Sequence, residues 1–285
     1  MFRACSDDGE LCICSRIWED GRTDISVFDT RSLKPLYKFC IDYHLVYVII
    51  SKDKEYMLLG DDYAFYIYTI EGDFLMSTRQ CDISLGGEEL AGINVSKDFK
   101  RVLTCCITGD LMFFDINPDE NVKSIELVSK QYSMGGWRTF ETDEGCIILY
   151  DDEPTRINIQ TMECEEISIP FRPYGRNNRK YIMTEKREVR LNSIDFDWKI
   201  LYTFEEQEQR VQYALGFSGS DQYVIIPKDN NQLEVVEVLQ DGQIRLAFSS
   251  TEIIRVWTVR VINDKLLQYD KKNDKLCCLA ELREL

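Results

Sequence analysis

Four short apolar runs lie within residues 89–127, and polar turns separate them. The runs span 92–95, 101–107, 111–116 and 122–127 and are rich in Ile, Val, Leu, Phe and Thr. Each has the length of a β-strand, and the Lys-Asp, Gly-Asp and Asn-Pro-Asp breaks are typical of turns. The stretch predicts a four-stranded antiparallel sheet. Such a sheet cannot bury both faces alone, so it should be one unit of a repeat.

The same pattern extends along the chain, and residues 46–79 align with residues 89–127 with little adjustment. The approximate units are 1–42, 43–84, 85–131, 132–170, 171–208, 209–250 and 251–285, of which the last has a cramped first strand. Seven units of roughly 40 residues match the period of β-propeller blades. We therefore expect an all-β fold in one domain, a seven-bladed β-propeller of four-stranded antiparallel blades.

Charge and cysteine content narrow the class of protein. The chain has 34 Lys and Arg against 50 Asp and Glu, a formal net charge of −16, which argues against general nucleic-acid binding and favours basic protein segments as partners. Its 11 cysteines lie mostly in apolar runs, as reduced core thiols of a cytoplasmic or nuclear protein do. No apolar run has the length of a signal peptide or a membrane span, so we expect neither secretion nor membrane insertion.

The third predicted strand of each unit ends in an apolar residue followed by a small polar or acidic one. These pairs are Phe28-Asp29, Tyr68-Thr69, Phe114-Asp115, Ile157-Asn158, Leu191-Asn192, Val236-Glu237 and Tyr269-Asp270. The series resembles, in degenerate form, the Trp-Asp dipeptide of WD-repeat propellers, and the turns at Ser51 and Ser96 take the place of the family's Ser-Pro-Asp-Gly turn. The family's Gly-His dipeptide does not repeat. The resemblance implies strand exchange between the first and last blades, whereas both terminal units here look nearly complete.

Motifs for catalysis or cofactor binding are missing from the sequence. The only histidine, His44, cannot supply the several imidazoles of a hydrolase triad or a histidine-based metal centre. The Gly pairs at 86–87 and 135–136 lack the remaining spacing of a phosphate loop or a dinucleotide fingerprint. No Cys-x-x-Cys pair is present, so the cysteines are predicted to pack in the core. We predict no catalytic residue, no metal, no cofactor and no enzyme activity.

Carboxylates occur in the loops between the second and third strands of many units. The propeller resemblance gathers these loops on one rim, where their charges would form a negative surface. The residues are Glu19, Asp20, Asp61, Asp62, Asp110, Asp151, Asp152, Glu153, Asp229 and Asp264. The alternative is that turns are generally rich in Asp and these loops are simply solvated, since the opposite rim also has acids.

Two further groups are candidates for partner contact. Trp137, Tyr174 and Tyr213 lie where first strands would enter the central opening, and an exposed aromatic residue there could anchor a peptide. Packing between blades is the alternative. Arg187 belongs to a basic stretch, 172–190, which suits either an acidic partner or a solvated edge with internal ion pairs.

The leading hypothesis is a non-catalytic scaffold or adaptor, a subunit of a larger hetero-oligomeric complex, that binds a protein segment across an acidic rim. The alternative from another class is an enzyme or small-ligand receptor that uses the central channel.

Overall fold

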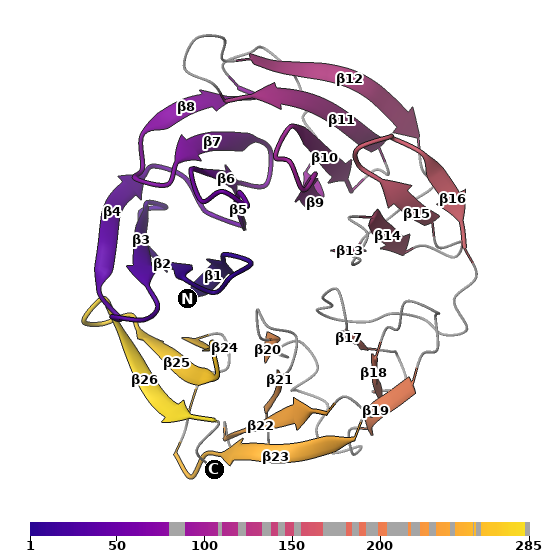
Figure 1. Ribbon diagram of the computed structural model, residues 1–285. Coiled ribbons are helices and arrows are strands. Elements are labelled where there is room, and N and C mark those ends of the chain that lie inside the picture. Colours follow the sequence, from indigo (N-terminus) through magenta and orange to yellow (C-terminus); the bar gives the residue numbers. More distant parts are fainter. Residues whose placement is uncertain are drawn as a thin grey trace.

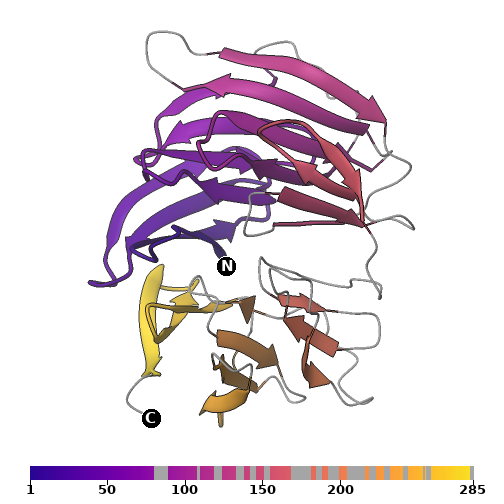
Figure 2. The ribbon, with the colours of Figure 1, turned by 45° about the vertical axis from the view of Figure 1, so that its right-hand side comes forward.

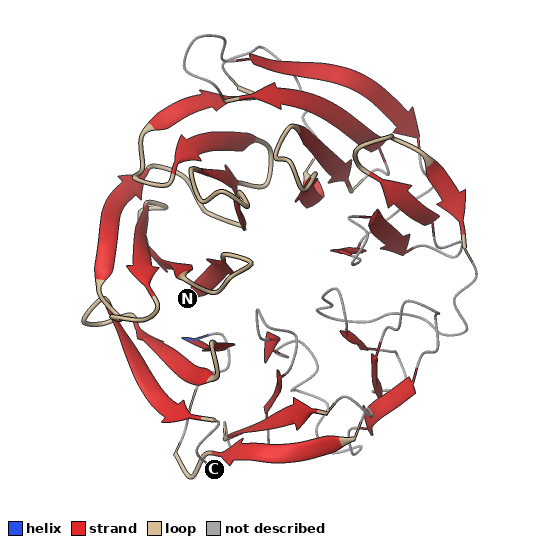
Figure 3. Cartoon of the chain, viewed as in Figure 1, coloured by secondary structure: helices blue, strands red, loops and turns tan. Residues whose placement is uncertain are grey.

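The computed structural model describes residues 1–79, 89–107, 110–118, 124–132, 138–141, 146–150, 155–167, 181–183, 188–191, 199–203, 216–217, 223–227, 232–239, 243–252, 254 and 258–282. Within these residues, 26 strands form seven antiparallel sheets, which are arranged in a ring (Figure 1). Strands and loops make up almost the whole ribbon (Figure 3). The predicted all-β class is therefore confirmed. No helix in the described part of the chain has the length and hydropathy of a membrane span.

Each sheet consists of strands that are consecutive in the chain. The first four sheets are β1 (Phe2–Cys5), β2 (Leu11–Ile17), β3 (Thr23–Asp29) and β4 (Pro35–Ile41); β5 (Tyr47–Ile50), β6 (Tyr56–Gly60), β7 (Phe65–Thr69) and β8 (Phe74–Ser77); β9 (Leu90–Val95), β10 (Arg101–Cys106), β11 (Asp110–Asn117) and β12 (Ser124–Tyr132); and β13 (Arg138–Glu141), β14 (Cys146–Tyr150), β15 (Thr155–Asn158) and β16 (Cys164–Glu166).

The last three sheets are β17 (Tyr181–Met183), β18 (Glu188–Leu191) and β19 (Lys199–Thr203); β20 (Gly216–Phe217), β21 (Tyr223–Pro227), β22 (Leu233–Val238) and β23 (Ile244–Ser249); and β24 (Val259–Ile262), β25 (Lys265–Asp270) and β26 (Lys275–Glu281). Two sheets thus have three strands within the described residues, where four were expected. The first strand of each sheet lies nearest the centre of the ring (Figure 1).

A recurring turn follows the first strand in the first three sheets. It begins at Ser6, Ser51 and Ser96. Each serine Oγ donates a hydrogen bond to the aspartate two residues later, at 2.6, 2.5 and 2.6 Å, and accepts one from the N–H five residues later, at 3.0, 2.9 and 2.9 Å. The fourth turn residue, which is Gly9, Lys54 or Phe99, has a φ of 68°, 64° or 57°. The aligned Ser-x-Asp sequences therefore fold alike, as their side-chain chemistry predicts.

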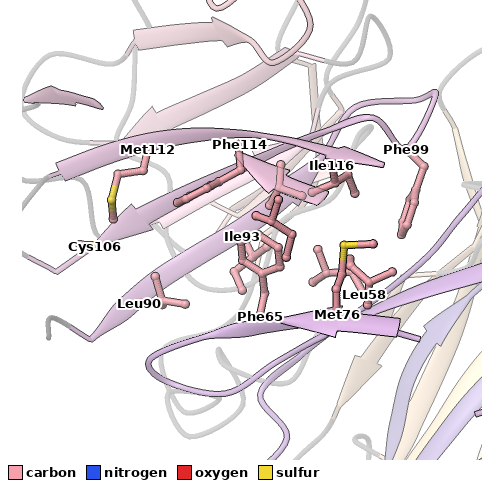
Figure 4. Packing of buried hydrophobic residues seen from close by; sticks show 13 residues of the cluster. Leu58, Phe65, Met76, Leu90, Ile93, Phe99, Cys106, Met112, Phe114 and Ile116 are labelled. Carbon is pink, nitrogen blue, oxygen red and sulfur yellow. The ribbon is translucent and has the colours of Figure 1, made fainter. Parts of the chain in front are cut away.

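The core lies between neighbouring sheets, because the apolar side chains point at the faces of the next sheet. Figure 4 shows the cluster between the second and third sheets, where Phe65 of β7 meets Phe114 of β11 edge to face at a centroid distance of 5.4 Å. Leu58 and Ile93 fill the space beside these rings. Burial of these apolar faces between neighbouring sheets stabilises the fold. An open ring would leave one apolar face of the first sheet and one of the last sheet exposed to water.

The first and last sheets meet through side chains and share no strand. Phe28 packs edge to face on Tyr269 at 6.1 Å, within a buried cluster drawn from both sheets. Asn263 Nδ2 donates to the carbonyl of Gly9 at 3.0 Å. A Cβ on Gly9 would lie 2.8 Å from Asn263 Oδ1, so a larger residue here would require the Asn263 side chain to move. Figure 2 shows the last sheet, in yellow, beside the first, in indigo.

The carboxylate of Asp274 bridges this seam. It accepts hydrogen bonds from Tyr269 Oη at 2.8 Å within its own sheet, and from Ser26 Oγ at 2.9 Å and Lys38 Nζ in the first sheet. The strand exchange implied by the family resemblance is therefore wrong for the described residues. Both terminal sheets are built from their own strands, and side-chain contacts close the ring.

Candidate functional site

The loops after the second strands carry fewer surface charges than the sequence predicts. Antiparallel strands alternate in direction, so these loops share one rim and the turns after the first strands share the other. Glu19 and Asp20 are exposed, and Asp62 is half-buried. Asp20 forms an ion pair with Arg22 at 2.8 Å. These three residues keep a place on the predicted rim, and their role in partner binding stays a prediction.

Asp61 does not belong to an exposed acidic surface. It is only 5% exposed, and Oδ1 accepts hydrogen bonds from the N–H groups of Tyr63 and Ala64, both at 2.7 Å. Oδ2 accepts from Tyr66 Oη at 2.8 Å and from Arg79 Nη2 at 2.7 Å. All four of these hydrogen bonds are internal to the second repeat unit, so Asp61 adds no exposed charge to the predicted rim, and its part in partner binding stays a prediction. Its role is to hold the β6–β7 loop.

Two other predicted rim residues also add no exposed charge to this rim. Asp110 is buried at the start of β11. Asp264 lies in the turn between β24 and β25, next to Asn263, which contacts the β1–β2 turn at Gly9. Because β24 is the first strand of its sheet, this turn belongs to the opposite rim. The remaining candidates lie outside the described residues and stay predictions: Trp137, Asp151, Asp152, Glu153, Tyr174, Arg187, Tyr213 and Asp229.

On that opposite rim, a groove of about 600 Å³ opens between the second and third sheets. Its floor is aromatic. The Tyr56 ring, at the start of β6, stacks on the Phe99 ring at 6.3 Å with an interplanar angle of 14°. Phe99 is the left-handed residue of the β9–β10 turn, a position that directs it back to the preceding sheet. The recurring turn thus positions the floor of the groove.

Carboxylates line the upper edge of the groove. Asp53 and Asp98 accept hydrogen bonds from their turn serines through Oδ1, at 2.5 and 2.6 Å, and both side chains are exposed. Glu55, two residues beyond Asp53, is also exposed. Lys100, which also lines the groove, is exposed. Three carboxylates against one ammonium give this edge a negative excess.

Among the described residues that line the groove, the guanidinium of Arg101 is already occupied. Arg101 Nε donates to Asp115 Oδ1 at 2.6 Å and Nη2 donates to Oδ2 at 3.1 Å, a paired geometry that raises the pKa of Arg101. Nη1 donates to the carbonyl of Gln160 in the fourth sheet at 2.5 Å. This bridge forms the far wall of the groove and links the third and fourth sheets.

The same turn connects the first and second sheets. Lys54, the left-handed residue of the β5–β6 turn, places Nζ 2.6 Å from Asp8 and 2.7 Å from Glu10. Although desolvation opposes the shift, hydrogen bonds from Lys54 and Ser6 lower the pKa of Asp8 to about 2. The turns of the first two sheets are therefore locked together, and the groove between the second and third sheets stays open.

The groove presents the half-buried Tyr56 ring, backed by the buried Phe99 ring, together with carboxylates. Among the residues that the structure describes, no group of three or more His, Cys, Asp and Glu side chains is arranged to hold a metal ion. The turns that build the groove are visible in the sequence as Ser-x-Asp. The sequence does not show that two of these turns, from different sheets, lie side by side. It therefore predicts the acidic partner-binding residues on the other rim.

No family model matches the sequence, and no curated protein matches it. Solved structures do match over nearly the whole chain. The β-propeller domain of Cps50 (Swd1) from Myceliophteria thermophila aligns with a TM-score of 0.63 and 14% identity, covering 96% of this chain and 94% of that one. The chain is a β-propeller. Hydrazine synthase from Kuenenia stuttgartiensis aligns with this propeller at a TM-score of 0.62 and 12% identity, covering 96% and 93%.

Significant structural similarity extends to 1356 solved chains, so the fold alone selects no function for this propeller. One of the two neighbours is named as an enzyme and the other as a propeller domain.

Proposed function

We propose that this propeller is a non-catalytic interaction scaffold, and that it binds a basic segment of another protein in the groove between the second and third sheets. The observation that carries the proposal is the stacked pair of Tyr56 and Phe99 beneath an edge of carboxylates. A Lys or Arg side chain entering the groove would meet an aromatic face and negative charge together, which is the pairing that cations favour.

We also infer from the sequence that this protein is a WD-repeat-like propeller of the cytoplasm or nucleus and a subunit of a hetero-oligomeric complex. The proposal keeps the basic partner expected from the net charge of −16 and moves its contact to the rim that carries the Ser-x-Asp turns. An enzymatic or small-ligand role for the central channel stays an untested alternative.

Neutralising the groove edge is expected to weaken binding of a basic peptide about tenfold, because three exposed charge contacts are lost at roughly 0.5 kcal/mol each. The variant combines Asp53→Asn, Glu55→Gln and Asp98→Asn. Asparagine at positions 53 and 98 keeps the side-chain oxygen that accepts the hydrogen bond from Ser51 or Ser96. Fluorescence anisotropy measures the affinity for a labelled peptide of alternating Gly and Arg or Lys residues at several salt concentrations. The affinity of the variant should depend less on salt than that of the wild type.

The matched control removes three exposed carboxylates from outer strands, with Glu126→Gln on β12 and Glu165→Gln and Glu166→Gln on β16. Both variants have the same net charge, so a contribution from the general field of the protein is equal in both. We expect the control to bind within about twofold of the wild type. Equal weakening in the two variants would show that the peptide senses total charge and that the groove is not its site.

A further inference from the structure

The last sheet ends at the position of a third strand. In the first three sheets, an N–H at the end of the third strand donates to a carbonyl that follows the first turn: Thr30 to Glu10 at 2.9 Å, Ile70 to Glu55 at 2.8 Å and Ile116 to Lys100 at 2.8 Å. After β26, the N–H of Leu282 donates to the carbonyl of Asp264 at 2.7 Å in the same way. Therefore β26 is the counterpart of β3, β7 and β11, and no described strand fills the fourth position beside it.

The exposure of β26 differs from that of the other third strands. Strands β3, β7 and β22 are buried over most of their length, because a fourth strand covers their outer edge. In β26, by contrast, Cys277, Cys278 and Leu279 are exposed, and Leu279 keeps 37% of its surface accessible. The strand lies at the outer margin of the ring (Figure 1). An apolar edge with outward N–H and C=O groups is a template for another strand.

Charge is distributed unevenly along this edge. Lys272 and Lys275 are both exposed at the start of β26, within a chain whose net charge is −16. At the other end of the strand, Glu281 lies 3.6 Å from Lys265, so its charge is balanced. The same turn contains Lys271, Asp270 and Asp274, and Asp274 is paired with Lys38. Three lysines and one unshared carboxylate leave a positive excess where β26 begins, and the middle of the edge is apolar.

We propose that the edge of β26 pairs with an extended segment of another protein, which supplies the fourth strand of the last sheet. The segment runs antiparallel to β26, as the fourth strands of this chain run to their neighbours. Its central residues are apolar, and its C-terminal end is acidic because it lies beside Lys272 and Lys275. Main-chain hydrogen bonds would supply affinity, and the charged end would set direction. This site is separate from the groove and does not rest on the proposed function.

The test uses a labelled peptide with the sequence of β23 (Ile244–Ser249) followed by two aspartates. Hydrogen exchange of the intact chain should show new protection in residues 275–281 when this peptide is bound. The double variant Lys272→Glu, Lys275→Glu should bind the peptide about tenfold more weakly, because attraction at the strand end becomes repulsion. A second peptide that ends in two lysines should show the reverse preference for the two proteins.

A peptide methylated on alternate backbone nitrogens is the control, since it cannot donate to a strand edge and should give no protection. The proposal is wrong if residues 275–281 gain no protection, or if the protected amides lie on the outer strands of other sheets. It is equally wrong if the chain alone self-associates with protection of 275–281, which would assign the edge to a second copy. Protection of this edge in the isolated monomer would show that the chain covers it itself.

Discussion

Replacing Asp61 with alanine is expected to lower the free energy of unfolding by about 3–5 kcal/mol. The carboxylate is buried and accepts four hydrogen bonds, two from the backbone of its own loop and the others from Tyr66 and Arg79. Its removal leaves the buried Tyr66 hydroxyl and the two loop N–H groups without their acceptor. Urea unfolding of the variant and the wild type, at neutral pH and extrapolated to water, measures the difference.

The adjacent residue provides the control. Asp62 has the same side chain in the same loop but is half-buried, and we expect Asp62→Asn to change stability by no more than about 0.5 kcal/mol. An Asp61→Ala variant as stable as the wild type would contradict the structural role of this carboxylate. If that variant also lost affinity for a basic peptide, the acidic rim predicted from the sequence would be correct after all.

Replacing Asp274 with alanine is expected to cost about 2–3 kcal/mol at neutral pH, because the seam loses the acceptor shared by Ser26, Lys38 and Tyr269. Desolvation by itself would raise the pKa of Asp274, but the hydrogen bonds from Lys38, Tyr269 and Ser26 outweigh it and lower the pKa. A carboxyl with a lowered pKa in the folded state stabilises the protein above its unfolded pKa, and this contribution is lost as the pH falls through the folded pKa.

The pH dependence of stability distinguishes the contribution of Asp274 at the seam from the general loss of stability of the protein in acid. The stability difference between the wild type and Asp274→Ala should be constant at neutral pH and should shrink below about pH 4, the ordinary value for Asp. Urea unfolding at several pH values measures it. Asp20→Ala, which removes an exposed ion pair with Arg22, serves as the control and should have little effect. A difference that stays constant down to the lowest pH would mean that the charge of Asp274 does not hold the seam.

The repeat could be predicted from the sequence because its signals are local. Strand-length apolar runs and the Ser-x-Asp turns at Ser51 and Ser96 determine their own conformation within a few residues. The sequence predicts the turn chemistry. The left-handed residues of these turns, Lys54 and Phe99, contact the preceding sheet. The sequence does not predict this contact, because it depends on how two sheets pack together.

The candidate site could not be predicted because it depends on contacts between units. Asp61 and Asp62 are identical neighbours in the sequence, and only the packing of Tyr66 and Arg79 makes the first one structural. The sequence predicts Asp264 on the other rim, because it does not reveal that β24 is the first of the three described strands of the last sheet. The groove lies between turns of two different sheets, so no single stretch of sequence predicts it.

The most direct test of the account is whether the first and last sheets meet through the ion pair of Lys38 and Asp274. These residues are 236 positions apart in the chain, and no strand is shared between their sheets. A zero-length carbodiimide reagent joins an amine to a carboxylate only when the two are in contact. Tryptic mass spectrometry of the dilute monomer should find an amide link between Lys38 and Asp274, and Lys38→Gln should abolish it. Formation of the Lys54 link to Asp8 or Glu10 without the Lys38–Asp274 link would contradict a ring closed in this way.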